Sequence, residues 1–232
     1  MKDIAIISVL FDYPSGIFPN FYRKALLEFD ENDVHVLRDH NLIESQSIYD
    51  KYTFYKIFRV LEYIKLNILG KYKYILFLDA TDTAFTKPIS PIIQKFEQLN
   101  CSILFCAEKG IWPHTGHEHL YENKKTTGDY KYLNSGGYFG YTEEIVKHMT
   151  SIQDNVYNFT PCDQGKWVME YLLNDTILID HECKIFFSTY ESKEHILVDG
   201  LNYTLKDNID AHIIHDNGPY TGNTIKVAHC YE

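Results

Sequence analysis

The stretch Tyr74-Ile-Leu-Phe-Leu-Asp79-Ala-Thr-Asp82 decides the fold, because an apolar run leads directly into two acids three positions apart. A fully apolar run of this length is typical of a strand buried in a parallel sheet. Open α/β sheets bind their ligands at the edge where such strands end. Carboxylates at that edge can hold a hard divalent cation, and the cation can bind the diphosphate of a nucleotide. The stretch therefore predicts a metal-diphosphate site.

The Asp-x-x-Asp spacing taken alone has a second interpretation. Aspartates also cap helices and begin turns, and Asp82 precedes Pro88 by only a few residues. The position directly after a buried strand favours metal binding, since two acids at the ligand-binding edge repel each other unless a cation lies between them. We therefore interpret Asp79 and Asp82 as metal ligands.

Composition limits the class of protein. The chain has 232 residues and no Pro, Gly or Ser-rich linker, which predicts one domain spanning residues 1–232. The formal net charge of −10 argues against a nucleic-acid-binding protein, which usually carries a basic face. The five cysteines are too scattered for a disulfide framework, so reduced thiols are expected.

The apolar run at residues 4–10 is too short to span a membrane, and no signal-like cleavage pattern follows it. We expect it to be the first strand, and we expect no membrane span and a cytoplasmic location. The oligomeric state stays open.

Apolar periodicity predicts alternating strands and helices. The pattern indicates strands at 4–10, 34–37, 74–79 and 101–107, and helices at 18–29, 55–69, 88–99 and 163–173, with a further helix starting near Glu143. Gly70 is a plausible C-cap for the second helix. This alternation predicts an α/β fold, a Rossmann-type mixed sheet flanked by helices. The last third of the chain reads as short strands and loops.

Five motifs occur in a fixed order and together resemble one family. The motifs are Asp79-Ala-Thr-Asp82, Phe105-Cys-Ala-Glu-Lys-Gly-Ile-Trp112-Pro, Tyr132-Leu-Asn-Ser-Gly-Gly137, Asp163-Gln164 and His215-Asp-Asn-Gly-Pro219. The series resembles the glycosyltransferase domain of the procollagen lysyl hydroxylase/collagen glucosyltransferase family. The resemblance implies a GT-A fold and a UDP-sugar donor used with Mn²⁺.

The resemblance also implies the metal ligands. Asp79 and Asp82 resemble the two acidic ligands of the family, and His215 resembles its histidine ligand. An imidazole beside two carboxylates favours manganese over the harder magnesium. Without the resemblance, His215 would be read as structural.

The other site residues are assigned by the same resemblance. Lys56, Asn217 and Gly218 resemble residues near the donor phosphates, and Trp112 resembles a tryptophan that lines the sugar pocket. A solvated helix face for Lys56, a turn for Asn217-Gly218 and a core position for Trp112 are the alternatives.

The glycine-containing segment is assigned to sugar recognition. Asn134 and Ser135 can donate or accept hydrogen bonds with sugar hydroxyls, and Gly136 and Gly137 allow close backbone approach. Structural support is the competing explanation.

Two positions depart from the family pattern. Asp163 and Gln164 match the second half of its Asp-Asp-Gln motif, but Cys162 stands where the first acid is expected, and a thiol cannot replace a carboxylate. Thr81 occupies the donor-binding position of a tyrosine that can stack on uracil, so base recognition must rely on the end of the first strand, around residues 8–10, or on backbone contacts.

The resemblance implies an enzyme, a UDP-sugar-dependent hexosyltransferase. By resemblance the donor is UDP-glucose or UDP-galactose, and the acceptor is hydroxylysine or galactosyl-hydroxylysine of a collagen-like protein. Asp163 is the expected catalytic carboxylate, as general base if the reaction inverts the anomeric centre, or steadying the sugar if it retains it. Two alternatives remain: a nucleotide-sugar-binding protein with little transfer activity, and a transferase acting on a non-collagen glycan.

Overall fold

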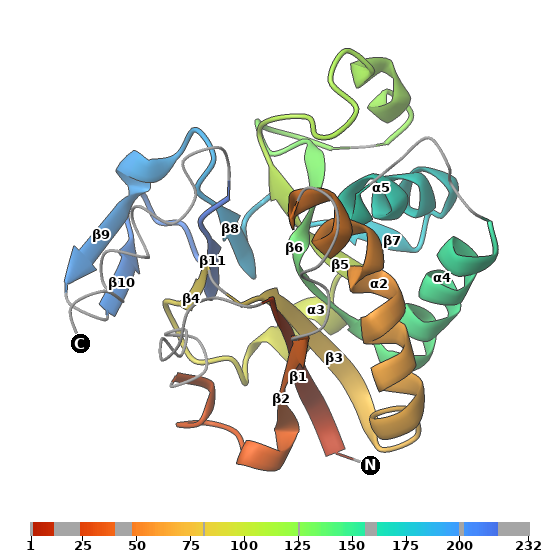
Figure 1. The fold of residues 1–232 in the computed structure, drawn as a ribbon. Coiled ribbons are helices and arrows are strands. Elements are labelled where there is room, and N and C mark those ends of the chain that lie inside the picture. Colours follow the sequence, from red (N-terminus) through yellow and green to blue (C-terminus); the bar gives the residue numbers. More distant parts are fainter. Residues whose placement is uncertain are drawn as a thin grey trace.

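The computed structural model describes residues 2–11, 24–39, 48–80, 82–124, 126–155, 162–199 and 202–217. The strands of the central sheet are β1 (Lys2–Phe11), β2 (Val34–Asp39), β3 (Tyr72–Asp79), β5 (Ile103–Glu108), β6 (Tyr132–Tyr141) and β7 (Ile177–Ile179). They lie in the order β2-β1-β3-β6-β5-β7 (Figure 1). β1 is parallel to β2 and β3, whereas β6 is antiparallel to both β3 and β5. The sheet is therefore mixed, as predicted.

Helices and a second sheet cover the two faces of the central sheet. The longer helices are α2 (Ile48–Asn67), α4 (Thr142–Asp154) and α5 (Asp163–Leu173), and they pack together on one face (Figure 1). The opposite face carries α3 (Ile92–Glu97) and a three-stranded sheet. The strands of this second sheet are β4 (Thr83–Phe85), β8 (Phe186–Ser188) and β11 (Ile213–His215), and they lie in the order β4-β11-β8. The remaining described strands form an antiparallel pair, β9 (Ile196–Asp199) and β10 (Asn202–Leu205). The remaining described helices are short 3-10 helices: η1 (Glu31–Asp33), η2 (Glu118–Tyr121) and η3 (Lys193–His195).

The central strand β3 is buried on both faces, which explains its continuous apolar run. Ile75 and Phe77 pack in the cluster under α2, α4 and α5, and their neighbours Leu76 and Leu78 pack in the cluster on the other face. Phe77 stacks on Tyr138 of the adjacent strand with ring centroids 4.7 Å apart. Each fully buried large apolar side chain stabilises the fold by about 1.5–3 kcal/mol. This packing fixes where β3 ends and so where Asp79 lies.

Several predicted element boundaries agree with the structure and others do not. α5 begins at Asp163, and Gly70 has the positive φ of 77° that favours glycine after a helix. α3 is shorter than the predicted helix at 88–99, because Pro91 occupies its N-cap and cannot donate an interior helical hydrogen bond. The predicted helix at 18–29 lies largely outside the described residues.

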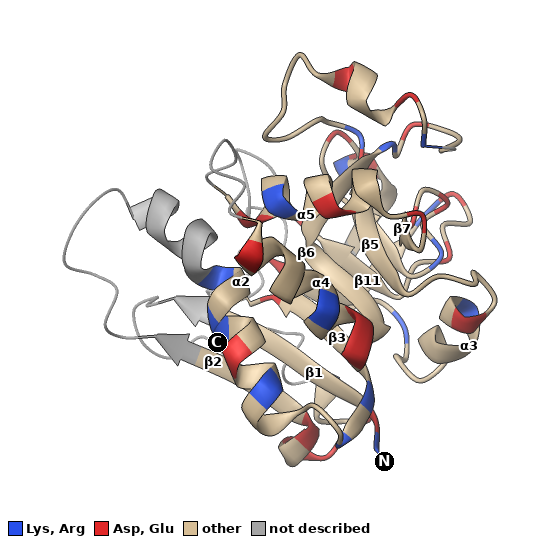
Figure 2. Cartoon of the chain, turned by 90° about the vertical axis from the view of Figure 1, so that its right-hand side faces the viewer, with Lys and Arg blue, Asp and Glu red and all other residues tan. Residues whose placement is uncertain are grey.

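Charged residues of both signs lie on the helices. Figure 2 shows basic and acidic residues on α2, α4 and α5. None of the described helices combines the length and the apolar character that a membrane span requires.

Candidate functional site

Three side chains from distant parts of the sequence meet at one edge of the central sheet. Asp79 is the last residue of β3, and Asp82 directly precedes β4. β11 pairs antiparallel with β4, and this pairing sets His215 opposite Thr83. The Asp216 N–H donates to the Asp82 carbonyl oxygen at 2.7 Å. Backbone pairing therefore brings His215 beside the two acids.

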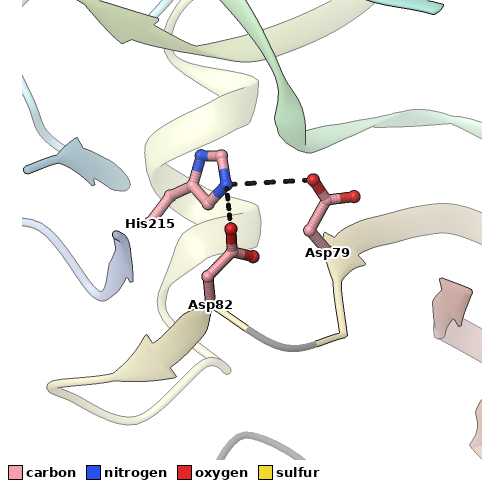
Figure 3. A group of neighbouring side chains, drawn as sticks. All are labelled: Asp79, Asp82 and His215. Atoms are coloured by element: carbon pink, nitrogen blue, oxygen red, sulfur yellow. Dashed lines mark ion pairs between the residues drawn. The ribbon is translucent and has the colours of Figure 1, made fainter. Parts of the chain in front are cut away.

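The three side chains converge on a small volume (Figure 3). His215 Nε2 lies 3.5 Å from Asp82 Oδ2 and 3.8 Å from Asp79 Oδ2. One ligand atom from each residue lies within 4.8 Å of the others. Within the described residues, Asp82 Oδ1 and both ring nitrogens of His215 are buried without a hydrogen-bond partner. Buried polar atoms are normally paired, so this set fits a divalent cation.

The electrostatics of His215 follow from its neighbours. Burial opposes the charged imidazolium, but Asp82, followed by Asp79, outweighs burial and raises the pKa of His215. The carboxylates thus favour positive charge at this position, which is the same preference that a bound cation would satisfy.

Lys56 connects the metal-binding candidates to a third acid. It projects from α2, and its Nζ lies 2.9 Å from Asp79 Oδ1 and 2.7 Å from Asp163 Oδ2. Burial disfavours the charged ammonium, but the carboxylates of Asp163 and Asp79 stabilise it more, so the pKa of Lys56 is raised. One buried ammonium therefore balances two carboxylates.

Asp163 is held at the start of α5. Ser135 Oγ donates to Asp163 Oδ2 at 3.0 Å. Cys162 is the N-cap residue, and its Sγ accepts a hydrogen bond from the Gly165 N–H at 3.4 Å. Burial raises the pKa of the Cys162 thiol, so this residue caps the helix as a neutral group.

Glu108 is a candidate residue that sequence reasoning did not single out. Its Oε1 accepts a hydrogen bond from Gln164 Nε2 at 2.7 Å, and its Oε2 accepts one from Asn217 Nδ2 at 2.5 Å. Burial raises its pKa to about 7 despite these donors. The available signal was position: Glu108 ends the fully buried β5 as Asp79 ends β3.

The glycine-containing segment lies in β6. Asn134 Oδ1 accepts a hydrogen bond from the Gly136 N–H at 2.9 Å, and the Ser135 N–H donates to Gln164 Oε1 at 3.2 Å. Gly136 lies against the His215 ring, and Gly137 lies against Phe186 in the core. At both glycines, the space that a Cβ would take is thus occupied by another side chain of the protein.

The metal-ligand candidates, Lys56, Asp163 and Glu108 line a cavity of about 890 Å³, which is the size of a typical small-molecule site. Trp112 stands at the cavity with 49 % of its surface exposed, and its carbonyl oxygen accepts a hydrogen bond from Gln164 Nε2 at 3.0 Å. The predicted residues that line the cavity are Lys56, Asp79, Asp82, Trp112, Asn134, Ser135, Gly136, Asp163, Gln164, His215 and Asn217.

Some predicted residues do not line this cavity or cannot be placed. Gly137 is absent from the cavity wall. Thr81 and Gly218 lie outside the described residues. Ser8, at the predicted base-binding end of β1, donates from its hydroxyl to the Leu78 carbonyl oxygen at 2.6 Å, which ties β1 to β3. A smaller cavity of about 460 Å³ beside β7 is lined by none of the predicted site residues.

A family model and two curated relatives match this chain. A model of the PLOD GT domain matches residues 55–226. Procollagen-lysine,2-oxoglutarate 5-dioxygenase 1 of Rattus norvegicus is 29% identical over 174 residues, covering 65% of this chain and 22% of that protein. Uncharacterized protein R699 of Acanthamoeba polyphaga mimivirus is 26% identical over 140 residues, covering 58% of this chain and 29% of that protein. The chain thus spans less than a third of the length of these relatives.

A solved structure has a similar fold. The crystal structure of a glycosyltransferase involved in the glycosylation of the major capsid of PBCV-1 superimposes with a TM-score of 0.57 at 16% identity, covering 98% of each chain. At this identity the likeness concerns the fold.

Proposed function

The chain belongs to the PLOD GT domain family, and from this premise we propose that it is a metal-dependent glycosyltransferase that moves a hexose from a UDP-sugar to an acceptor hydroxyl. The observation that carries the proposal is the convergence of Asp79, Asp82 and His215 in the wall of a cavity large enough for a sugar nucleotide. Dinucleotides and mononucleotides bind open α/β sheets at this edge.

The metal group would hold Mn²⁺ through one oxygen of each acid and one ring nitrogen of His215. The bound ion would supply charge neutralisation for the diphosphate leaving group, which is commonly a large part of catalysis. Lys56 adds a fixed positive charge beside Asp79, at 2.9 Å. We propose that this ammonium also faces the donor phosphates.

Asp163 is the proposed catalytic carboxylate. It lines the cavity, is only 4 % exposed, and is oriented by Lys56 and Ser135. A carboxylate so held can accept the acceptor's proton in an inverting reaction or steady the sugar in a retaining one. Trp112 and Asn134 are proposed to contact the transferred sugar from the same cavity.

The finer proposal concerns substrates. We propose UDP-glucose or UDP-galactose as donor, and hydroxylysine or galactosyl-hydroxylysine of a collagen-like protein as acceptor. The support is the family membership and the names of the relatives, one of which is a procollagen-lysine dioxygenase.

Cys162 supports a second candidate function, a nucleotide-sugar-binding protein with little transfer. The buried thiol has a raised pKa and cannot act as a carboxylate on the acceptor side of the site. The two functions differ in turnover, not in donor binding.

The deciding experiment measures UDP release with Mn²⁺, using UDP-glucose and UDP-galactose, with and without a hydroxylysine-containing collagen peptide or its galactosylated form. Acceptor-stimulated release is expected. Donor binding without stimulation would favour the second candidate function or another acceptor, and absence of UDP and Mn²⁺ binding would contradict the proposal.

A thermal-shift measurement tests the metal group separately. Because Mn²⁺ and UDP should bind the folded chain and not the unfolded one, together they should raise Tm by mass action. Asp79→Ala and Asp82→Ala should erase that gain, as should chelation with EDTA. Asp175→Ala is the matched control, because Asp175 is fully exposed and outside the cavity.

A further inference from the structure

The side-chain amide of Gln164 joins the start of α5 to three other places in the fold. Gln164 is the second residue of α5 and is only 8 % exposed. Its Nε2 donates to Glu108 Oε1 at 2.7 Å and to the Trp112 carbonyl oxygen at 3.0 Å. Its Oε1 accepts a hydrogen bond from the Ser135 N–H at 3.2 Å. One amide therefore holds the end of β5, the segment after β5 and the strand β6 against α5.

The partners of this amide fix its orientation. A backbone N–H can only donate a hydrogen bond, and a backbone carbonyl oxygen can only accept one. The Ser135 N–H therefore requires Gln164 Oε1, and the Trp112 carbonyl oxygen requires Gln164 Nε2. The second hydrogen of Nε2 is taken by Glu108. Although Gln164 lines the cavity, both of its N–H groups are thus used inside the protein and neither is left for a sugar nucleotide.

Glu108 is itself held so that it faces Gln164. Its other carboxylate oxygen, Oε2, accepts from Asn217 Nδ2 at 2.5 Å, and Asn217 Oδ1 accepts from Ser188 Oγ at 2.6 Å. All four residues of this chain of hydrogen bonds are buried. Turning Glu108 away from Gln164 would leave buried polar atoms without partners, which is unfavourable. The amide of Gln164 is therefore held in one position.

The hydrogen bond from Gln164 fixes the backbone of a residue whose side chain is half exposed. Trp112 is 49 % exposed and lines the cavity. It belongs to the long segment between β5 and β6, which projects beyond the ends of these strands (Figure 1). The base of this segment is closed by the Lys131 N–H, which donates to the Glu108 carbonyl oxygen at 3.2 Å. Long connecting segments are the more mobile parts of a fold, so an indole carried on one needs a fixed backbone to keep one position.

We propose that Gln164 is a positioning residue for the transferred sugar, because its amide fixes the backbone of Trp112 and so holds the indole in the wall of the cavity. The inference rests on the proposed transferase function, in which Trp112 contacts that sugar. It gives Gln164 a role that is exerted through Trp112 and not through direct contact with the donor.

Gln164→Glu removes the hydrogen bond to Trp112 with little change of shape. The variant keeps the length of the side chain and an oxygen that can accept from the Ser135 N–H. An ionised carboxylate has no hydrogen to donate, and a protonated one has a single O–H, which the neighbouring Glu108 carboxylate would accept. The Trp112 carbonyl oxygen therefore loses its donor in either form.

Tryptophan fluorescence measures the exposure of Trp112 without any substrate. The chain has two tryptophans, and the other one, Trp167, is 1 % exposed in the core. Acrylamide quenching of the full chain therefore reports on Trp112, and Trp112→Phe gives the background signal of Trp167. Gln164→Glu should raise the quenching constant by up to about twofold, since the released segment takes Trp112 from half exposed toward fully exposed.

A binding measurement shows whether the position of Trp112 matters for the sugar. Calorimetric titration in the presence of Mn²⁺ compares UDP with UDP-glucose and UDP-galactose. For the preferred UDP-sugar, Gln164→Glu should weaken binding relative to UDP by about fivefold, which is about 1 kcal/mol. The Kd of UDP itself should change by less than about twofold, because the metal group is intact.

Two control variants separate this role from a general loss of stability. Ser102→Ala removes a buried hydrogen bond from Ser102 Oγ to the Thr176 carbonyl oxygen, at the other end of β5. It should lower stability and change neither the quenching constant nor the relative binding of the UDP-sugar. Glu108→Gln combined with Gln164→Glu exchanges the amide and the carboxylate, so the hydrogen bond between the two positions is kept. The exchange should recover stability but not the wild-type quenching constant, because position 164 still has no hydrogen for Trp112.

Three results would overturn the inference. Unchanged quenching in a folded Gln164→Glu chain, or wild-type quenching in the exchanged double variant, would show that Gln164 does not hold Trp112. Equal loss of affinity for UDP and the UDP-sugar, or no loss for either, would show that the hydrogen bond does not serve the sugar. Absence of UDP and Mn²⁺ binding by the wild-type chain would instead contradict the proposed function. The quenching experiment needs no ligand, so it would still decide whether Gln164 holds Trp112.

Discussion

The imidazole of His215 lies directly against the backbone of Gly136: a Cβ at Gly136 would fall 2.1 Å from His215 Cε1 and 2.4 Å from Nε2. Such separations are far inside van der Waals contact, so Gly136→Ala must displace the ring. We expect the variant to lose the Tm gain from Mn²⁺ and UDP, and to be destabilised by about 1–3 kcal/mol through overpacking. Thermal shift and calorimetric titration with Mn²⁺ measure the two effects.

Gly137→Ala is the matched control for this prediction. Its Cβ would lie 3.1 Å from the Phe186 ring and 3.7 Å from Cys106 Cβ, and no metal-ligand candidate is among its nearest neighbours. It should lower stability and keep the Mn²⁺ and UDP gain. Full metal binding in a folded Gly136→Ala chain would remove His215 from the metal group.

Lys56→Met should destabilise the chain strongly. The substitution leaves Asp79 and Asp163 without the ammonium that lies within 2.9 Å of both carboxylates. Breaking a buried pair on one side typically costs about 3–5 kcal/mol. Urea unfolding at pH 7 without metal measures the loss.

A double variant and a surface control test whether the loss of stability in Lys56→Met comes from its ion pair with Asp163. Lys56→Met with Asp163→Asn should lose less stability than the sum of the two single changes, because the second removes one uncompensated charge. Lys147→Met breaks the exposed pair with Glu144 on α4 and should change stability by less than about 0.5 kcal/mol. Additive losses in the double variant would contradict the coupling of Lys56 to Asp163.

The sequence predicted the parts of the fold that depend on local pattern. The apolar run of β3 and the start of α5 at Asp163 were found where expected, and the α/β fold and the family are confirmed by the comparisons. A strand buried on both faces gives a continuous apolar run, and a helix gives apolar residues at helical spacing. Both patterns can be read from a single segment of the sequence.

The ten-residue strand β6 was not predicted as a strand, because its glycines at 136, 137 and 140 disfavour one by local propensity. Each of these glycines is required by close approach of a distant residue: His215, Phe186, and the backbone at Ser102 and Ile103. That requirement is tertiary and cannot be read from the segment itself.

The sequence named most of the residues that line the candidate cavity, but it did not predict which of them pair with one another. The salt bridge from Lys56 to Asp163 joins residues 107 positions apart, and the amide contacts to Glu108 come from α5 and from the end of β11. Only the folded chain brings them together. The metal identity, the sugar and the single-domain boundary at residues 1–232 stay predictions.

Glu108 should make stability depend on pH. Burial raises its pKa from 4.5 to about 7 in the folded chain, so the folded chain holds this proton more tightly than the unfolded chain does. The stabilisation is present below pH 4.5 and is lost as pH rises from 4.5 to about 7, by about 3 kcal/mol in total. Glu108→Gln cannot titrate and should flatten this part of the profile.

Urea unfolding from pH 4.5 to 8, without metal, measures that difference. The comparison uses the slope of the unfolding free energy against pH for each variant. A pH-independent loss of stability from a changed hydrogen bond in Glu108→Gln does not affect that slope. Glu122→Gln, at an exposed residue, is the control and should follow the wild-type curve. Parallel curves for wild type and Glu108→Gln would show that the pKa of Glu108 is the same in the folded and the unfolded chain, which would contradict the prediction.

Asp163→Asn should separate catalysis from donor binding. The amide oxygen can still accept from Ser135, but the residue loses the negative charge that lines the cavity and pairs with Lys56. Removing a general base or charge-stabilising carboxylate lowers turnover by about 10²–10⁴-fold, so kcat should fall by that order. The Kd of UDP with Mn²⁺ should stay within about threefold, because Asp163 is not a metal ligand in this assignment and threefold is under 1 kcal/mol. Asp82→Asn should have the opposite effect, because Asp82 is a metal ligand in this assignment: the Kd of UDP with Mn²⁺ should rise by more than about threefold. Equal loss of turnover and UDP affinity in Asp163→Asn would remove Asp163 from the catalytic role and assign it to the donor site.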